Sequence, residues 1–228
     1  ILSLYPKLKA PSRIGVYGLL LGAGIILSYI LSNQIPFDPI RLSWDRMQIF
    51  YICLYYLLLS LPFFFFGLSV STAFAAISEK SGLLYGSDLL GAGIGSISIL
   101  YLMSIMSPEN SIILVSSIAL TGAFILGSWK IKGISVFLIM LNAIILTMPF
   151  LISPRMSQYK GLQSALRYPG AEHIKTYNSP FSRIDIFKSP AVRFAPGLSL
   201  KYLDDLPEQT GISIDGGDIN AITNAGDK

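Results

Sequence analysis

The stretch MQIFYICLYYLLLSLPFFFFGLSVSTAFAAI, residues 47–77, decides the class of this protein. It contains no Asp, Glu, Lys or Arg. A helix needs about 20 mostly apolar residues to cross the hydrocarbon core of a membrane, which is roughly 30 Å thick. The stretch exceeds that length, so it predicts a transmembrane helix.

Four further stretches have the same character, at 14–31, 83–106, 111–127 and 134–152. Their connections are short: Ser107-Pro108-Glu109-Asn110 is typical of a turn, and Trp129-Lys130-Ile131-Lys132 is typical of an interfacial anchor. Short connections favour antiparallel neighbours. We therefore expect a membrane all-α fold, with about five transmembrane helices in an up-down bundle over residues 1–153.

The charges are distributed in agreement with this division. Of the whole chain, 52% is hydrophobic and only 13% charged, with a mean hydropathy of +0.60, whereas soluble domains carry about 25% charged residues. After Pro154 the composition becomes ordinary. Residues 154–228 are therefore predicted to be a small β-rich soluble segment, which is too short for a stable core of its own and so forms an incomplete domain.

Within this polar segment, residues 158–166 predict a short helix. Residues 173–177 and 183–188 alternate as strands around an Asn178-Ser179-Pro180 turn, which predicts a hairpin. Further strands are expected at 198–202 and 212–215, and Gly216-Gly217 should form a turn after the last of them.

The rare residue types exclude several classes of function. Cys53 is the only cysteine and His173 the only histidine, so there is no intrachain disulfide and no Cys/His spacing for a metal. We interpret His173 as a strand or surface residue. No phosphate loop and no Gly-x-Gly-x-x-Gly follows a strand, so no cofactor is predicted. The net charge of +4 comes from residues at segment ends, which favours membrane topology over nucleic-acid binding.

Small residues in two of the apolar stretches permit close helix packing. Gly91 and Gly95 are four residues apart and share one helix face. The full set is Gly15, Gly18, Gly22 and Gly24 in the first stretch, and Gly86, Gly91 and Gly95 in the third.

Three acidic residues are candidates for a polar site. Asp88 lies in the third apolar stretch, where a carboxylate facing lipid costs about 2.5–3.5 kcal/mol. It should therefore lie near the interface, face the interior of the bundle or have a partner. Asp215 and Asp218 end the last predicted strand, a position that suits polar substrates or cations and equally suits a tight turn.

Several motifs, in this order along most of the chain, resemble the membrane-embedded spermidine-synthase-like proteins. They are Leu84-Tyr85-Gly86-Ser87-Asp88-Leu89-Leu90-Gly91-Ala92, Ser157-Gln158-Tyr159-Lys160-Gly161-Leu162, Ser182-Arg183-Ile184-Asp185, Ala195-Pro196-Gly197-Leu198-Ser199 and Asp215-Gly216-Gly217-Asp218. The resemblance implies a multi-span region, then a β-rich segment, then a Rossmann-type aminopropyltransferase-like domain acting on a polyamine. The catalytic residues of that domain would lie beyond Lys228. The chain starts at Ile1 rather than Met, so we expect a fragment or a processed product.

Two other functions fit the same residues. The first is a membrane scaffold or accessory subunit, with protein partners bound through its transmembrane helices. The second is a transporter-like bundle, for which Asp88 and Asn142 supply few polar groups. In every case the lipid bilayer is a partner, and the expected location is a multi-pass position in the cytoplasmic or inner membrane of a prokaryote.

The orientation is nearly balanced by the positive-inside rule. With five spans, six basic residues fall on one side and five on the other. The first set is Lys7, Lys9, Arg13, Lys80, Lys130 and Lys132, and the second is Arg41, Arg46, Arg155, Lys160 and Arg167. The family resemblance favours a cytoplasmic polar tail, by analogy alone.

Overall fold

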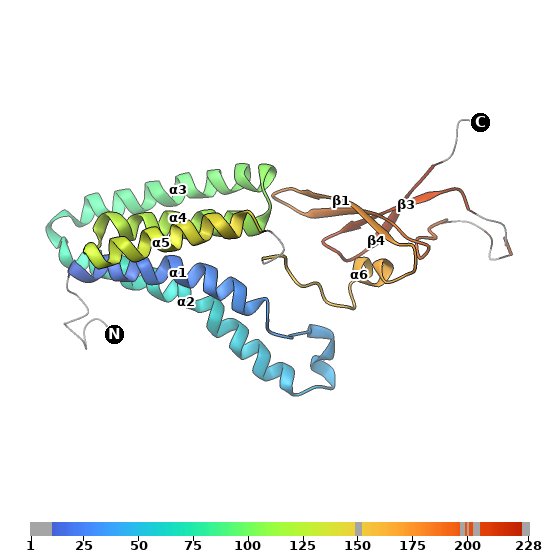
Figure 1. The fold of residues 1–228 in the computed structure, drawn as a ribbon, viewed down its shortest axis with the longest axis horizontal. Helices are drawn as coiled ribbons and strands as arrows, with labels where there is room; N and C mark the ends of the chain where they lie inside the picture. Colours follow the sequence, from blue (N-terminus) through green and yellow to red (C-terminus); the bar gives the residue numbers. More distant parts are fainter. Residues whose placement is uncertain (1–10, 149–151, 197–198, 200, 203–205, 225–228) are drawn as a thin grey trace. The chain divides into compact units, whose positions relative to one another are not determined.

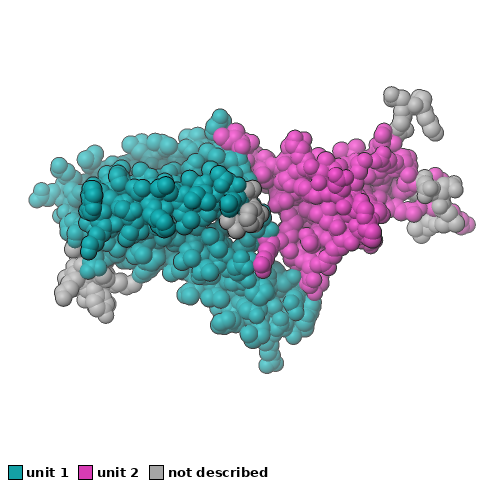
Figure 2. All heavy atoms as spheres, viewed as in Figure 1, with its two compact units in different colours: residues 1–102, 106–154 teal, residues 103–105, 155–228 magenta. Residues whose placement is uncertain are grey.

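The computed structural model describes residues 11–148, 152–196, 199, 201–202 and 206–224. The chain divides into two compact units, residues 1–102 with 106–154 and residues 103–105 with 155–228 (Figure 2).

The first unit contains five long helices, α1 to α5 in Figure 1. Each is long and apolar enough to cross a membrane, which confirms the five apolar stretches as helices. Their bounds are α1 Ile14–Ser32, α2 Met47–Ala76, α3 Ser81–Ile105, α4 Pro108–Leu126 and α5 Trp129–Leu146. Short 3-10 turns, η2 Pro11–Arg13, η3 Pro39–Ser43 and η4 Ser78–Lys80, precede α1, α2 and α3.

Helix α5 differs most from its predicted range. It begins at Trp129, so the residues predicted to be an interfacial anchor form its first turn. It ends at Leu146, where the Thr147 amide and hydroxyl both donate to the carbonyl of Ile144. Pro149 follows three residues after Leu146 in the sequence and has no amide hydrogen with which to continue a helix.

Helix α1 packs against α4 through its glycines, as predicted. A Cβ built on Gly15 would lie 2.5 Å from the Cα of Gly127, and one built on Gly22 would lie 2.6 Å from Cγ of Leu120. A Cβ on Gly18 would meet Cβ of Ala123 at 3.3 Å. The absence of side chains on this face of α1 therefore sets how closely the two helices approach.

Helix α3 does not share this packing. None of its residues is buried, and the close helix contacts of the unit join α1 with α2, α1 with α4, and α4 with α5. Cβ atoms built on Gly86, Gly91 and Gly95 meet nothing within 4 Å. Although its connections to α2 and α4 are short, α3 does not pack closely against either helix. In this respect the structure differs from the expected up-down bundle. That these three glycines pack against another helix stays a prediction, and that helix would lie outside the described residues.

The second unit is a four-stranded antiparallel sheet with strand order β1-β2-β3-β4. Its elements are α6 Gly161–Leu166, β1 Glu172–Asn178, β2 Arg183–Lys188, β3 Gln209–Ile214 and β4 Ile219–Thr223. Phe187 of β2 is fully buried against Leu162 and Ala165 of α6. This small core holds the helix on one face of the sheet.

The predicted hairpin of β1 and β2 is confirmed, and β3 covers the predicted strand at 212–215 except for its last residue. Strand β4 was not predicted, because its five residues are too short for a clear alternation. The strand expected at 198–202 lies partly outside the described residues; Ser199, Lys201 and Tyr202 are described and are not in a strand.

The packing of α1 predicts opposite effects for two Gly-to-Ala substitutions. Gly15→Ala should lower the free energy of unfolding by about 1–3 kcal/mol, because its methyl group overlaps the backbone of Gly127. Gly86→Ala meets open space and should keep or slightly raise stability, since alanine favours helix by about 1 kcal/mol over glycine. Thermal unfolding in detergent, followed by circular dichroism, measures both. Equal effects of the two variants would contradict this account of the packing.

Candidate functional site

Three of the motifs singled out in the sequence meet at the turn between β3 and β4. The amide of Asp215 donates to the carbonyl of Arg183 at 2.8 Å, and the amide of Arg183 donates to Oδ1 of Asp215 at 2.9 Å. Lys160 Nζ donates to the carbonyl of Asp215 at 2.6 Å, and the amide of Leu162 donates to the carbonyl of Gly216 at 3.2 Å. Segments 157–162, 182–185 and 215–218 therefore form one structure.

The local sequence explains why the chain turns here. Asp215 and Gly216 have φ angles of 52° and 68°, and the amide of Gly217 donates to the carbonyl of Ile214. Two consecutive left-handed residues are the signature of a type I′ hairpin turn, for which Asp-Gly is a preferred pair. Gly216 can adopt this conformation because it has no Cβ.

The candidate acidic residues of this turn have different surroundings. The carboxylate of Asp215 accepts a backbone hydrogen bond from β2, so it holds the turn against the sheet. Asp218 is exposed, and within the described part of the chain no hydrogen bond or ion pair to its carboxylate is recorded. The turn expected from Asp and Gly is therefore present, with Asp215 in a structural position and Asp218 open to solvent.

A buried carboxylate, Asp185, lies beside this turn on β2. Its side chain is fully buried, and it accepts hydrogen bonds from Nε and Nη2 of Arg183, each at 2.9 Å at the shortest. Oγ1 of Thr176 donates to it at 2.6 Å, and Nε2 of His173 lies 3.0 Å from it. The charge of Arg183 and these hydrogen bonds compensate for the loss of water around the carboxylate.

The pKa of Asp185 reflects this competition. Burial alone would raise the pKa, but the hydrogen bonds from Arg183, Thr176 and His173 and the charge of Arg183 outweigh burial and hold the pKa below its ordinary value. Asp185 is therefore ionised at neutral pH.

A β-bulge brings the two β1 side chains to this carboxylate. His173 and Thr176 are three residues apart, so in a regular strand they would point to opposite faces of the sheet. The register shifts between His173 and Lys175, which inserts one extra residue and returns both side chains to the face of Asp185. On the other side of β2, Ser213 of β3 pairs with Asp185. The hydroxyl of Ser213 is buried and, in the described structure, has no hydrogen-bond partner.

Sequence reasoning located His173 correctly on a strand but missed its contact with Asp185. One signal was present: Arg183 and Asp185 are two residues apart on a predicted strand, so they must share a face. The bulge that recruits His173 and Thr176 leaves no comparable signal in the sequence.

In the helical unit, Asp88 lies on α3, about 10 Å from the start of the helix. It is exposed, and among the described residues no hydrogen bond or ion pair to its carboxylate is recorded. It therefore does not face a packed interior of this chain.

The other polar candidate of the helical unit, Asn142, is buried and already has partners. Its Nδ2 donates to Oγ of Ser116 at 3.1 Å and to Oγ of Ser117 at 3.0 Å. Ser116 in turn donates to the carbonyl of Gly22 at 2.7 Å. These bonds link α1, α4 and α5 and leave Asn142 as a packing residue.

The metal-binding reading can be checked over the same part of the chain. Among the described residues, no group of three or more His, Cys, Asp or Glu side chains is placed to hold a metal ion.

Comparison with known proteins adds no assignment: no family model, curated protein or solved structure matches the chain. Interpretation of the site therefore depends on its geometry and on the motifs of the sequence.

The Asp185 network predicts a specific loss on mutation. Asp185→Asn removes the charge that Arg183 contacts and should destabilise the sheet locally by about 1.5–3 kcal/mol, the range for hydrogen bonds to charged groups. Amide hydrogen exchange in β2 and β3 of the full-length chain should then accelerate roughly 10- to 150-fold at neutral pH. Asp218→Asn, an exposed substitution in the same unit, is the matched control and should leave exchange unchanged.

The same network predicts a pH dependence. Because the folded pKa of Asp185 lies below its ordinary value of 3.8, its contribution to stability is complete above pH 3.8 and declines as the pH falls through the folded pKa. Protection of β2 and β3, corrected for intrinsic exchange, should fall at low pH in the parent chain and much less in Asp185→Asn. A parallel decline in both chains would show that another group is responsible.

Proposed function

We propose that this chain is the membrane-embedded portion, with the β-rich segment, of a spermidine-synthase-like protein. The observation that carries the proposal is the meeting of segments 157–162, 182–185 and 215–218 around the Asp215-Gly216 turn. These segments carry the resemblance to that family, and they are separated from one another in the sequence. In this proposal the contact among the three motifs reflects a shared origin with that family.

The order of the two units supports the same proposal. The resemblance implies several membrane spans followed by a β-rich segment, and the chain has five helices of sufficient length and apolarity followed by a four-stranded sheet. Large apolar side chains remain exposed along the helices, for example Phe63 on α2, Leu90 on α3 and Phe137 on α5. Lipid contact would satisfy these side chains, and water would not.

In this proposal the chain is an anchor and not the catalytic part. The aminopropyltransferase-like domain implied by the resemblance would carry the sites for a polyamine and its sulfonium cosubstrate. The β-rich segment would join that domain to helices held in the cytoplasmic or inner membrane of a prokaryote.

The proposal is tested on the native protein. Intact mass and sequencing of the chain purified from its source membrane should reveal about 200–300 residues after Lys228, including a Gly-rich strand-turn-helix. Membranes containing that protein should transfer an aminopropyl group to a polyamine, whereas membranes from a deletion strain should not. A native chain that ends at Lys228 would contradict the proposal that an aminopropyltransferase-like domain follows.

A scaffold or accessory subunit is the second candidate, because α3 is apolar, has no buried residue and carries Asp88, whose carboxylate has no hydrogen bond or ion pair among the described residues. In that case a partner helix should contact Asp88. Asp88→Leu should then dissociate a complex that is seen on native gels of mild detergent extracts, while Asp88→Asn, which keeps hydrogen bonding, should retain part of it. If α3 faces lipid alone, Asp88→Leu should instead leave the migration unchanged and raise stability by about 2.5–3.5 kcal/mol.

A further inference from the structure

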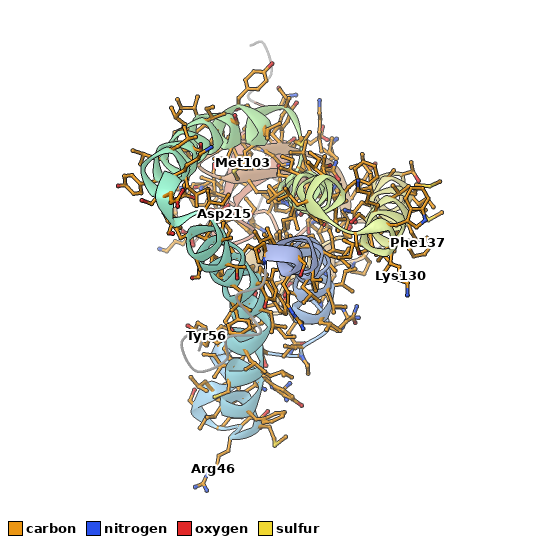
Figure 3. The ribbon with its side chains drawn as sticks, turned by 90° about the vertical axis from the view of Figure 1, so that its left-hand side faces the viewer. Arg46, Tyr56, Met103, Lys130, Phe137 and Asp215 are labelled. Atoms are coloured by element: carbon orange, nitrogen blue, oxygen red, sulfur yellow. The ribbon has the colours of Figure 1, made fainter. Side chains whose placement is uncertain are left out.

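The loop between α1 and α2 has an unusual division of its charges. It contains two aspartates and two arginines, Asp38, Asp45, Arg41 and Arg46. Both carboxylates accept backbone hydrogen bonds: Asp38 from the amide of Ile40 at 3.1 Å and Asp45 from the amide of Met47 at 3.0 Å. Both arginines are exposed, and within the described residues neither guanidinium group has a recorded hydrogen bond or ion pair. Both carboxylates are therefore bonded within the loop; the charge of Arg41 acts on Asp45, whereas Arg46 points outward (Figure 3).

Buried Gln48 gives this loop a fixed shape. Its Oε1 accepts from the amide of Asp38, and its Nε2 donates to Oδ2 of Asp45, both at 2.9 Å. The hydrogen bond from Gln48, followed by that from the Met47 amide and the charge of Arg41, lowers the pKa of Asp45. Asp45 therefore stays ionised and oriented toward the start of α2, which leaves Arg46 free to point outward, as Figure 3 shows.

Apolar side chains lie between and beside the arginines. Trp44 is 63% exposed, Ile40 48% and Leu42 45%. Tryptophan prefers the membrane–water interface, where an apolar ring can lie beside polar headgroups. Helix α2 has 30 residues and is about 45 Å long, whereas the hydrocarbon core is roughly 30 Å thick. A helix of this length tilts within the core or extends beyond it, and in the second case its first turn, next to the loop, lies in the headgroup region.

We propose that Ile40, Arg41, Leu42, Trp44 and Arg46, here called the loop surface, bind anionic phospholipids, whose headgroup phosphate is not balanced by a choline cation. The guanidinium group matches phosphate through paired N–H donors, and the apolar residues enter the acyl boundary. The partner is a lipid because the apolar side chains alternate with outward positive charge along one short loop. This inference rests on the membrane insertion that is part of the proposed function.

Trp44 can report on its own lipid neighbours. The chain has two tryptophans, and Trp129 is 89% exposed, so Trp129→Phe should leave Trp44 as the single fluorophore in an intact fold. The protein is reconstituted in vesicles of phosphatidylcholine with 30 mol% phosphatidylglycerol, that is, roughly one anionic lipid in three. In one preparation the phosphatidylglycerol is brominated, and in the other an equal amount of phosphatidylcholine is brominated.

The expected result is stronger quenching of Trp44 by brominated phosphatidylglycerol, with a relative affinity of about five-fold for each arginine that contacts a phosphate. The preference should disappear in the double variant Arg41→Gln/Arg46→Gln and should survive in part in Arg41→Lys/Arg46→Lys. The control Lys130→Gln/Lys132→Gln changes charges on α5 and should keep the preference.

Equal quenching by the two brominated lipids, or a preference that survives in the double glutamine variant, would overturn the lipid site. Absence of quenching by both lipids would overturn it as well. Extraction of the vesicles with alkaline carbonate separates this inference from the proposed function: a chain that resists extraction is inserted, whereas an extracted chain also refutes the membrane anchor.

Discussion

The close approach of α1 and α4 is the constraint on which the helical unit depends. Gly15 and Gly127 leave no room for a Cβ between the two backbones. This proximity also allows Ser116 of α4 to donate to the carbonyl of Gly22. Because these glycines have no side chain, the two helices come close enough for dispersion contacts and this interhelical hydrogen bond to act at the same interface. Helices α2 and α5 then pack on the pair from outside.

In the β-rich unit, the buried carboxylate of Asp185 has a comparable role. There a charge, and not close packing of backbones, organises the surrounding residues. A buried carboxylate is costly unless every lone pair has a partner. Here Arg183, Thr176 and His173 provide those partners, and β1 has a bulge that places two of them. The network lies next to the Asp215 turn because Arg183 contacts both features through different atoms. Packing around Phe187 and the polar network thus stabilise two ends of the same sheet face.

The two units have different properties, and these agree with the proposed function. The helices expose apolar surface, and Asn142 already has hydrogen-bond partners within the unit. The β-rich unit has a small core and a hydrogen-bonded turn, and in the proposed function it joins the helices to a further domain. The exposed arginines of the α1–α2 loop would give the anchor a preference for anionic lipid.

Local features of the sequence determined the helices and the first hairpin. Uncharged runs such as 47–77 are long enough to fix helix position without knowledge of their neighbours, and the alternation in 183–188 identifies β2 directly. The Asp215-Gly216 pair likewise specifies its turn through the backbone conformation that these two residues tolerate.

The choice among similar residues required the tertiary structure. Glycines of α1 and α3 look alike in the sequence, yet Gly15 contacts α4 whereas Gly91 faces open space. His173 contacts Asp185 only because a bulge in β1 changes the face of the sheet to which the His173 side chain points. Helix and turn formation depend on neighbours a few residues away, so the sequence alone determined them. Helix partners and the Asp185 network depend on contacts between distant segments, which no local pattern encodes, so only the tertiary structure decided them.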